Sequence, residues 1–87
     1  MHILIGDIGN TVTKICLVDI KDFNIKKIFY FNSKEIKSQK YLTSKFKKIL
    51  KNKLMCKTAL FSSVVPNYQL KIKKILNKIH RIKMREI

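Results

Sequence analysis

The fold of this chain is decided around Asp7-Ile8-Gly9-Asn10-Thr11, a polar stretch that lies between two short apolar runs. The first run, from His2 to Gly6, is continuous and is typical of a central strand buried on both faces. A second strand is expected to start near Thr13 and to end at Asp19. The stretch between the two strands therefore predicts a tight β-hairpin turn.

A turn of this composition can bind a phosphate group. Gly9 has no Cβ, so the backbone can approach an anion closely, and successive N–H groups can form a concave anion-binding nest. The side chains of Asn10 and Thr11 can donate further hydrogen bonds, and Lys14 can act as a point cation. Asp7 is itself anionic and is better suited to hold a hydrated Mg²⁺ that bridges to the phosphates. The competing interpretation is a hairpin turn without function, since such dipeptides are common in hairpins.

A second motif, Ser62-Ser63-Val64-Val65-Pro66, favours the functional interpretation. The pattern Asp-x-Gly-Asn-Thr-x-x-Lys, followed about fifty residues later by Ser-Ser-Val-Val-Pro, resembles the type III pantothenate kinases. The resemblance covers essentially the whole chain but only the N-terminal part of that family. It implies an α/β fold of the actin, sugar-kinase and Hsp70 group (ribonuclease H-like), in which two similar domains enclose ATP. It also implies transfer of the ATP γ-phosphate to the 4′-hydroxyl of pantothenate, the first step towards coenzyme A.

By this resemblance, the predicted ATP-binding residues form one continuous segment, with Asp7 also predicted as the Mg²⁺ ligand. They are Asp7, Ile8, Gly9, Asn10, Thr11, Val12, Thr13 and Lys14. The serines of the second motif have no activating base within the sequence pattern, because His2 and His80 are both isolated. We therefore expect Ser62 and Ser63 to support the structure or to line the cleft rather than to act as nucleophiles.

No catalytic residue is predicted in this chain. The resembling kinases carry their general-base aspartate in a Gly-x-Asp-Arg motif downstream of the second motif, where it also contacts pantothenate. No Gly or Asp follows Pro66 here, and Asp19 and Asp22 lie on the wrong side of the hairpin strands to replace the missing aspartates. The family's aspartate for a monovalent cation (K⁺ or NH₄⁺) belongs to its second half. We therefore expect an N-terminal half that binds ATP feebly and is inactive alone, as a truncated product, an incomplete sequence, or a subunit completed by a partner chain. The resembling kinases are homodimers.

The rest of the pattern predicts one domain over residues 1–87, with a mixed sheet and the order βββαβα. A turn at residues 22–24 and a strand over 25–31 complete an antiparallel meander. Ser38 is a candidate N-cap for a helix whose apolar face extends to Leu54. Residues 58–65 predict a strand that returns parallel to its neighbour. Asn67 is a candidate cap for a second helix, and residues 81–87 are a candidate final strand.

The net charge of +15 suggests nucleic-acid binding as an alternative function. However, the basic residues are eighteen Lys and two Arg, and they accompany fourteen Ile and six Asn. An A·T-rich genome explains the abundance of Lys, Ile and Asn together, whereas nucleic-acid recognition favours Arg. A steep dependence of duplex DNA affinity on salt would support the alternative. A non-catalytic accessory relative of the same fold is a further alternative.

Several other classes of protein are disfavoured by the sequence. No apolar run approaches the length of a membrane span, and the N-terminal run lacks the features of a signal peptide, so we expect a cytoplasmic location. Cys16 and Cys56 lie forty residues apart without further ligands at metal-binding spacing. They are expected to be structural rather than part of a metal site or a disulfide scaffold.

Overall fold

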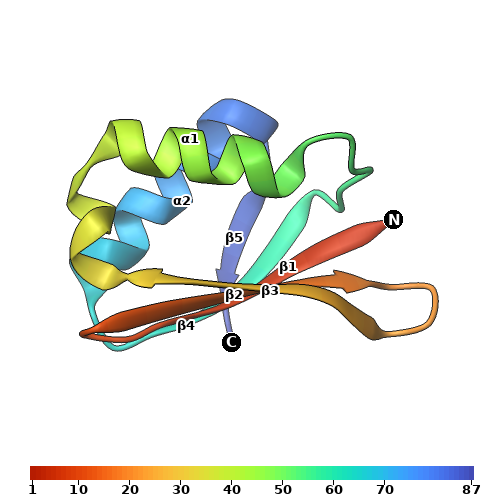
Figure 1. Cartoon of the computed structure of the whole chain (residues 1–87), viewed down its shortest axis with the longest axis horizontal. Helices are drawn as coiled ribbons and strands as arrows, with labels where there is room; N and C mark the ends of the chain where they lie inside the picture. The colour runs from red at the N-terminus through yellow and green to blue at the C-terminus, as the bar shows by residue number, and fades with distance from the viewer.

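The computed structural model describes residues 1–87 and consists of one five-stranded sheet with two α-helices packed on one of its faces (Figure 1). The strands are β1 (His2–Ile8), β2 (Val12–Asp19), β3 (Asn24–Asn32), β4 (Thr58–Ser63) and β5 (Lys83–Glu86). The helices are α1 (Gln39–Leu50) and α2 (Pro66–His80), and a short 3₁₀ helix, η1 (Ser33–Lys37), precedes α1. The predicted order βββαβα with a final strand is therefore confirmed.

The strands are arranged in the order β3-β2-β1-β4-β5. Strand β2 is antiparallel to both β1 and β3, whereas β4 is parallel to both β1 and β5. The sheet is therefore mixed, as predicted, because short turns join antiparallel strands and helices join parallel ones. Strand β1 lies at the centre of the sheet, which brings the two sequence motifs onto neighbouring strands.

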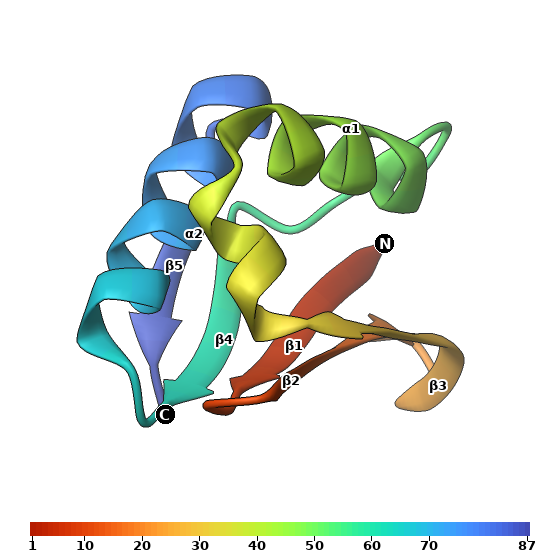
Figure 2. The same cartoon turned by 60° about the vertical axis from the view of Figure 1, so that its left-hand side comes forward.

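Figure 2 shows both helices on the same side of the sheet, and the buried core residues lie between these two layers. Along β1, the side chains of Leu4 and Ile8 are fully buried on the helical face. Ile3 and Ile5 point to the opposite face and are only half-buried. The prediction that β1 is buried on both faces is therefore wrong, because both helices pack against the same face of the sheet.

Close packing at the centre of the sheet depends on Gly6. It is paired with Phe61 across β1 and β4, and the ring of Phe61 lies over the Gly6 backbone. A Cβ at this position would overlap the ring, which is itself fully buried. The glycine is therefore required by packing rather than by backbone conformation.

Helix α1 begins as predicted and ends earlier than predicted. The Ser38 side chain accepts a hydrogen bond of 3.1 Å from the Tyr41 N–H and caps the helix. The helix ends at Leu50, and Asn52 adopts a left-handed conformation with φ 58° that does not continue a helix. As a result, Leu54 is 68% exposed and does not belong to the apolar face of α1.

Helix α2 begins at Pro66, so Asn67 is not its cap. The capping position is Val65, whose N–H donates to the Ser63 hydroxyl at 3.0 Å, and Pro66 occupies the first helical turn. Proline suits this position because the N–H that it lacks would have no helical partner. The second motif thus forms the end of β4 and the corner that leads into α2. Neither α1 nor α2 is long and apolar enough to cross a membrane.

Candidate functional site

The predicted tight hairpin turn is present. The Gly9 N–H donates to the Val12 carbonyl at 3.1 Å, so only Asn10 and Thr11 lie between the paired residues. A Cβ on Gly9 would lie 2.8 Å from that carbonyl oxygen, closer than atoms pack in proteins. Gly9 has no positive φ, so this position needs glycine for the close approach of two backbone segments.

The turn presents hydrogen-bond donors to solvent. The N–H groups of Asn10 and Thr11 make no hydrogen bond within the protein, and both side chains are exposed. The N–H of Gly9, in contrast, is already used within the turn. The predicted anion-binding nest is therefore reduced to two successive N–H groups, with the Asn10 amide and the Thr11 hydroxyl beside them.

Three polar side chains lie in a row across the sheet face that the helices leave open. Asp7 pairs with Lys14 on β2 and with Ser62 on β4, so all three point to the same face. The Ser62 hydroxyl donates a hydrogen bond of 2.9 Å to Oδ1 of Asp7. Lys14 lies beside Asp7 without forming an ion pair with it. The two sequence motifs therefore meet at the Asp7 carboxylate.

The Asp7 carboxylate fits the requirements of a hydrated magnesium ion. It is exposed, and one of its oxygens has no partner within the protein because Ser62 contacts only Oδ1. No group of three or more metal-ligating side chains exists in the structure. A single free carboxylate is enough for Mg²⁺, which usually keeps several waters and takes its remaining ligands from substrate phosphates.

A shallow hollow of about 240 Å³ lies beside the turn and is lined by Asn10, Thr11, Asn32 and Lys34. The hollow contains no apolar lining residue, and Lys34 makes no ion pair. Sequence reasoning gave no role to any residue between the predicted strand over 25–31 and Ser38, and so missed Lys34. A lysine shortly after the end of the predicted strand over 25–31 was the available signal, but it is one of eighteen lysines in the chain.

Two residues of the predicted ATP-binding segment face the core. Ile8 and Thr13 are fully buried, and the Thr13 hydroxyl lies 2.8 Å from that of Ser33. Their side chains cannot contact a nucleotide, because alternate residues of a strand point to opposite faces of the sheet. Val12 is 47% exposed and lies on the same face as Lys14.

The comparisons with known proteins show the family of this chain. Residues 3–87 match the family described as type III pantothenate kinase. The chain belongs to this family. It is 41% identical over 85 residues to the type III pantothenate kinase of Pelagibacter ubique (strain HTCC1062). That alignment covers 98% of this chain but 34% of the relative, so the chain spans about a third of the length of the curated relative that it matches.

A solved structure supports the fold of this type III pantothenate kinase family member. The crystal structure of the Ppx/GppA family member from Aquifex aeolicus aligns with a TM-score of 0.50 at 11% sequence identity. The alignment covers all of this chain and 35% of that one. At this identity the likeness concerns the fold alone, and it confirms the predicted actin-like α/β class.

The other aspartates lie away from the family's hairpin motif. Asp19 pairs with His2, at the opposite end of the hairpin from Asp7. Asp22 follows in the β2–β3 turn, where the Asn24 N–H donates to its carboxylate and lowers its pKa below the ordinary value of 3.8, with a further contribution from Lys26. Neither residue can replace Asp7.

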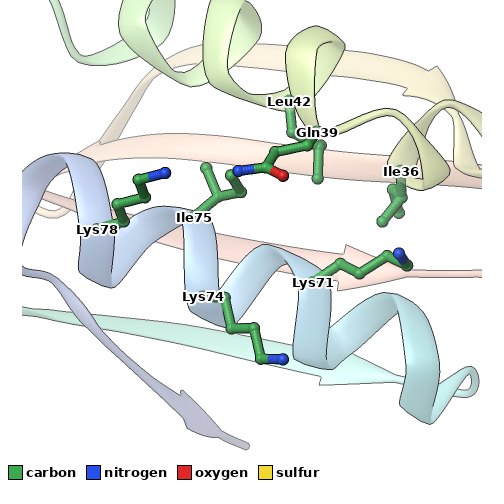
Figure 3. A pocket seen from close by; sticks show the side chains of 7 residues that line it. All are labelled: Ile36, Gln39, Leu42, Lys71, Lys74, Ile75 and Lys78. Carbon is green, nitrogen blue, oxygen red and sulfur yellow. The ribbon is translucent and has the colours of Figure 1, made fainter.

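A separate crevice of about 290 Å³ lies between η1, α1 and α2 (Figure 3). Three lysines of α2 (Lys71, Lys74 and Lys78) surround it, and Ile36, Leu42 and Ile75 form its apolar part. No carboxylate lines this crevice, so it lacks the negatively charged ligand that Asp7 provides at the hairpin. It is also built on the helical layer, whereas Asp7 and Lys14 face the open side of the sheet. We therefore place the candidate site at the hairpin.

Proposed function

We propose that this chain supplies the first phosphate- and magnesium-binding surface of an enzyme that phosphorylates pantothenate with ATP to give 4′-phosphopantothenate. The observation that carries the proposal is the position of the Asp7 carboxylate. It is oriented by Ser62 and lies next to Lys14 and close to a turn with two unused N–H groups. Membership of the type III pantothenate kinase family supports the proposed reaction and substrates.

The charge of each group determines whether it binds the phosphates or the metal ion. Phosphoryl transfer depends mainly on holding the phosphates, placing the metal and orienting the attacking hydroxyl. The Asn10 and Thr11 N–H groups and the ammonium groups of Lys14 and Lys34 can hold phosphate oxygens. Asp7 would hold hydrated Mg²⁺, which neutralises charge on the phosphates when bound.

The proposal leaves the base and the acceptor site to another part of the enzyme. Residues 67–87 contain no aspartate and no glycine, so the family's Gly-x-Asp-Arg motif is absent from this chain. We propose that residues 1–87 form one N-terminal ATPase-like domain, that a second segment or a partner chain completes it, and that the assembled enzyme is a cytoplasmic homodimer. The family's K⁺ or NH₄⁺ site has no candidate ligand here. The isolated chain is expected to bind MgATP weakly and to leave pantothenate unphosphorylated.

The test is a titration of the ¹⁵N-labelled chain with ATP, with Mg²⁺ and then with EDTA. The amide signals of Asn10 and Thr11 should shift in a saturable way, and removal of Mg²⁺ should weaken the affinity. Shifts confined to the three lysines around the helical crevice would contradict the proposal. An assay for phosphorylated pantothenate on the same sample should give no product, and robust turnover would overturn the assignment of the base to another segment.

A further inference from the structure

Thr13 and Ser33 are the only buried polar side chains in this protein, and both are fully inaccessible. They lie twenty residues apart in sequence, on β2 and at the start of η1, and their hydroxyl oxygens are 2.8 Å apart. Burial of a hydroxyl costs free energy unless it is hydrogen-bonded. The burial of these two hydroxyl groups therefore depends on the hydrogen bonds that they make.

The direction of the hydrogen bonds follows from the number of available protons. The Ser33 hydroxyl lies 2.6 Å from the Gly9 carbonyl oxygen, which can only accept, so Ser33 donates its single proton there. Thr13 must then donate to Ser33. In addition, the Ser33 backbone N–H donates to the Thr11 carbonyl at 2.8 Å. One residue thus fixes two carbonyl groups of the hairpin turn.

These contacts determine where the donors of the turn point. In a planar trans peptide unit, the C=O of one residue and the N–H of the next point in opposite directions. When Ser33 holds the Gly9 carbonyl towards the core, the Asn10 N–H must point away from the core. The Thr11 carbonyl, at the other side of the turn, is held by the Ser33 backbone N–H. Figure 1 shows η1 (yellow) next to the β1–β2 turn at one end of the sheet.

We propose that Ser33 is a positioning residue for nucleotide binding, which acts by orienting the backbone donors of the phosphate turn. It does not touch the nucleotide, and Thr13 assists by donating to it. This inference rests on the proposed function of the turn. The loss of the Ser33 hydroxyl should release the Gly9 carbonyl and allow the Asn10 peptide to rotate.

The test compares stability with affinity. Ser33→Ala should weaken MgATP binding by about three- to tenfold, the order expected for one hydrogen bond, and should also lower the thermal midpoint. The double variant Thr13→Val/Ser33→Ala removes the orphaned Thr13 hydroxyl and should recover part of the lost thermal midpoint, because one of the two groups that Ser33→Ala leaves unpaired is then absent. Its affinity should remain low, since the Gly9 carbonyl is still unpaired. Ile72→Val, in the core under α2, should lower the midpoint without a change in affinity.

Two outcomes would overturn the inference. One is wild-type affinity in Ser33→Ala, and the other is a double variant that regains affinity together with stability. A residual dipolar coupling of the Asn10 N–H, measured without nucleotide, reports the orientation of this bond independently of binding. It should change in Ser33→Ala and in Thr13→Val/Ser33→Ala and should not change in Ile72→Val. If the wild-type chain shows no saturable binding, the proposed function fails, while an unchanged coupling would separately reject the role of Ser33.

Discussion

Ser62 and Asp7 lie fifty-five residues apart in sequence and are joined by a hydrogen bond of 2.9 Å. The contact exists because β4 pairs with β1 in parallel register, which places Ser62 directly beside Asp7 on the open face of the sheet. A hydroxyl that donates to one carboxylate oxygen restricts the orientation of the other. Ser62 of the second motif therefore orients the Asp7 carboxylate of the first. This contact accounts for Ser62 without a role as a nucleophile.

The first prediction concerns this pair. Asp7→Asn keeps the shape of the side chain and removes the negative charge, so it should abolish the Mg²⁺-dependent part of ATP affinity, a loss of about tenfold or more. Ser62→Ala should give a smaller loss, because the carboxylate remains but is less well oriented. Calorimetric titrations with and without Mg²⁺ measure both effects. An Asp7→Asn chain whose affinity still rises with Mg²⁺ would exclude Asp7 as the ligand.

The second prediction distinguishes the role of Gly9 in the turn from that of Gly6 in the core. Gly9→Ala forces the Val12 carbonyl to move, so it should weaken ATP binding and cost about 1–3 kcal/mol of stability. Gly6→Ala places a methyl group against the Phe61 ring in the core and should destabilise the fold at least as much. Under conditions in which it remains folded, its turn should keep the wild-type amide shifts. Thermal unfolding and ¹⁵N spectra distinguish these effects, and identical shifts at Asn10 in Gly9→Ala and wild type would contradict the prediction.

The third prediction tests whether the hollow beside the turn binds phosphate. Lys34→Ala and Lys14→Ala should each weaken ATP binding severalfold, and the loss should diminish at high salt because exposed charges are screened. Lys47→Ala, on the exposed side of α1, provides the matched control with the same change in net charge. Equal losses in all three variants would indicate non-specific attraction by the total charge rather than a site.

The fourth prediction concerns pH. The pKa of Asp22 is lowered in the folded chain by the hydrogen bond from the Asn24 N–H, so its ionised form favours folding. This contribution is present above the ordinary pKa of 3.8 and is lost as the pH falls through the lower folded value. Wild type should therefore be slightly more stable than Asp22→Asn near neutral pH, and the difference should shrink in acid. Thermal midpoints of both chains across the acidic range measure it, and a pH-independent difference would contradict the assignment.

Local patterns predicted most of the elements because each depends on neighbouring residues. Ser38 at the start of an apolar stripe indicated the beginning of α1, whereas β4 ends at Ser63, before the predicted end at Val65, and Pro66 begins α2. The same reasoning was wrong where a local pattern is compatible with two different structures. An apolar run such as residues 2–6 fits a strand buried on one face or on both. Leu54 fits the spacing of the α1 stripe, but the left-handed conformation of Asn52 breaks the helix first.

The sequence alone determined the hairpin, the composition from which phosphate binding is predicted, and the family resemblance, because these features lie in short stretches of consecutive residues. Only the tertiary structure decided which of the eight predicted site residues face outward. It also brought Ser62 to Asp7, Lys34 to the turn, and Ser33 beneath Gly9. These contacts join residues far apart in the chain, and they depend on strand register and on the side of the sheet that the helices cover. Neither property is encoded in any single segment, because both are set by the packing of the whole chain.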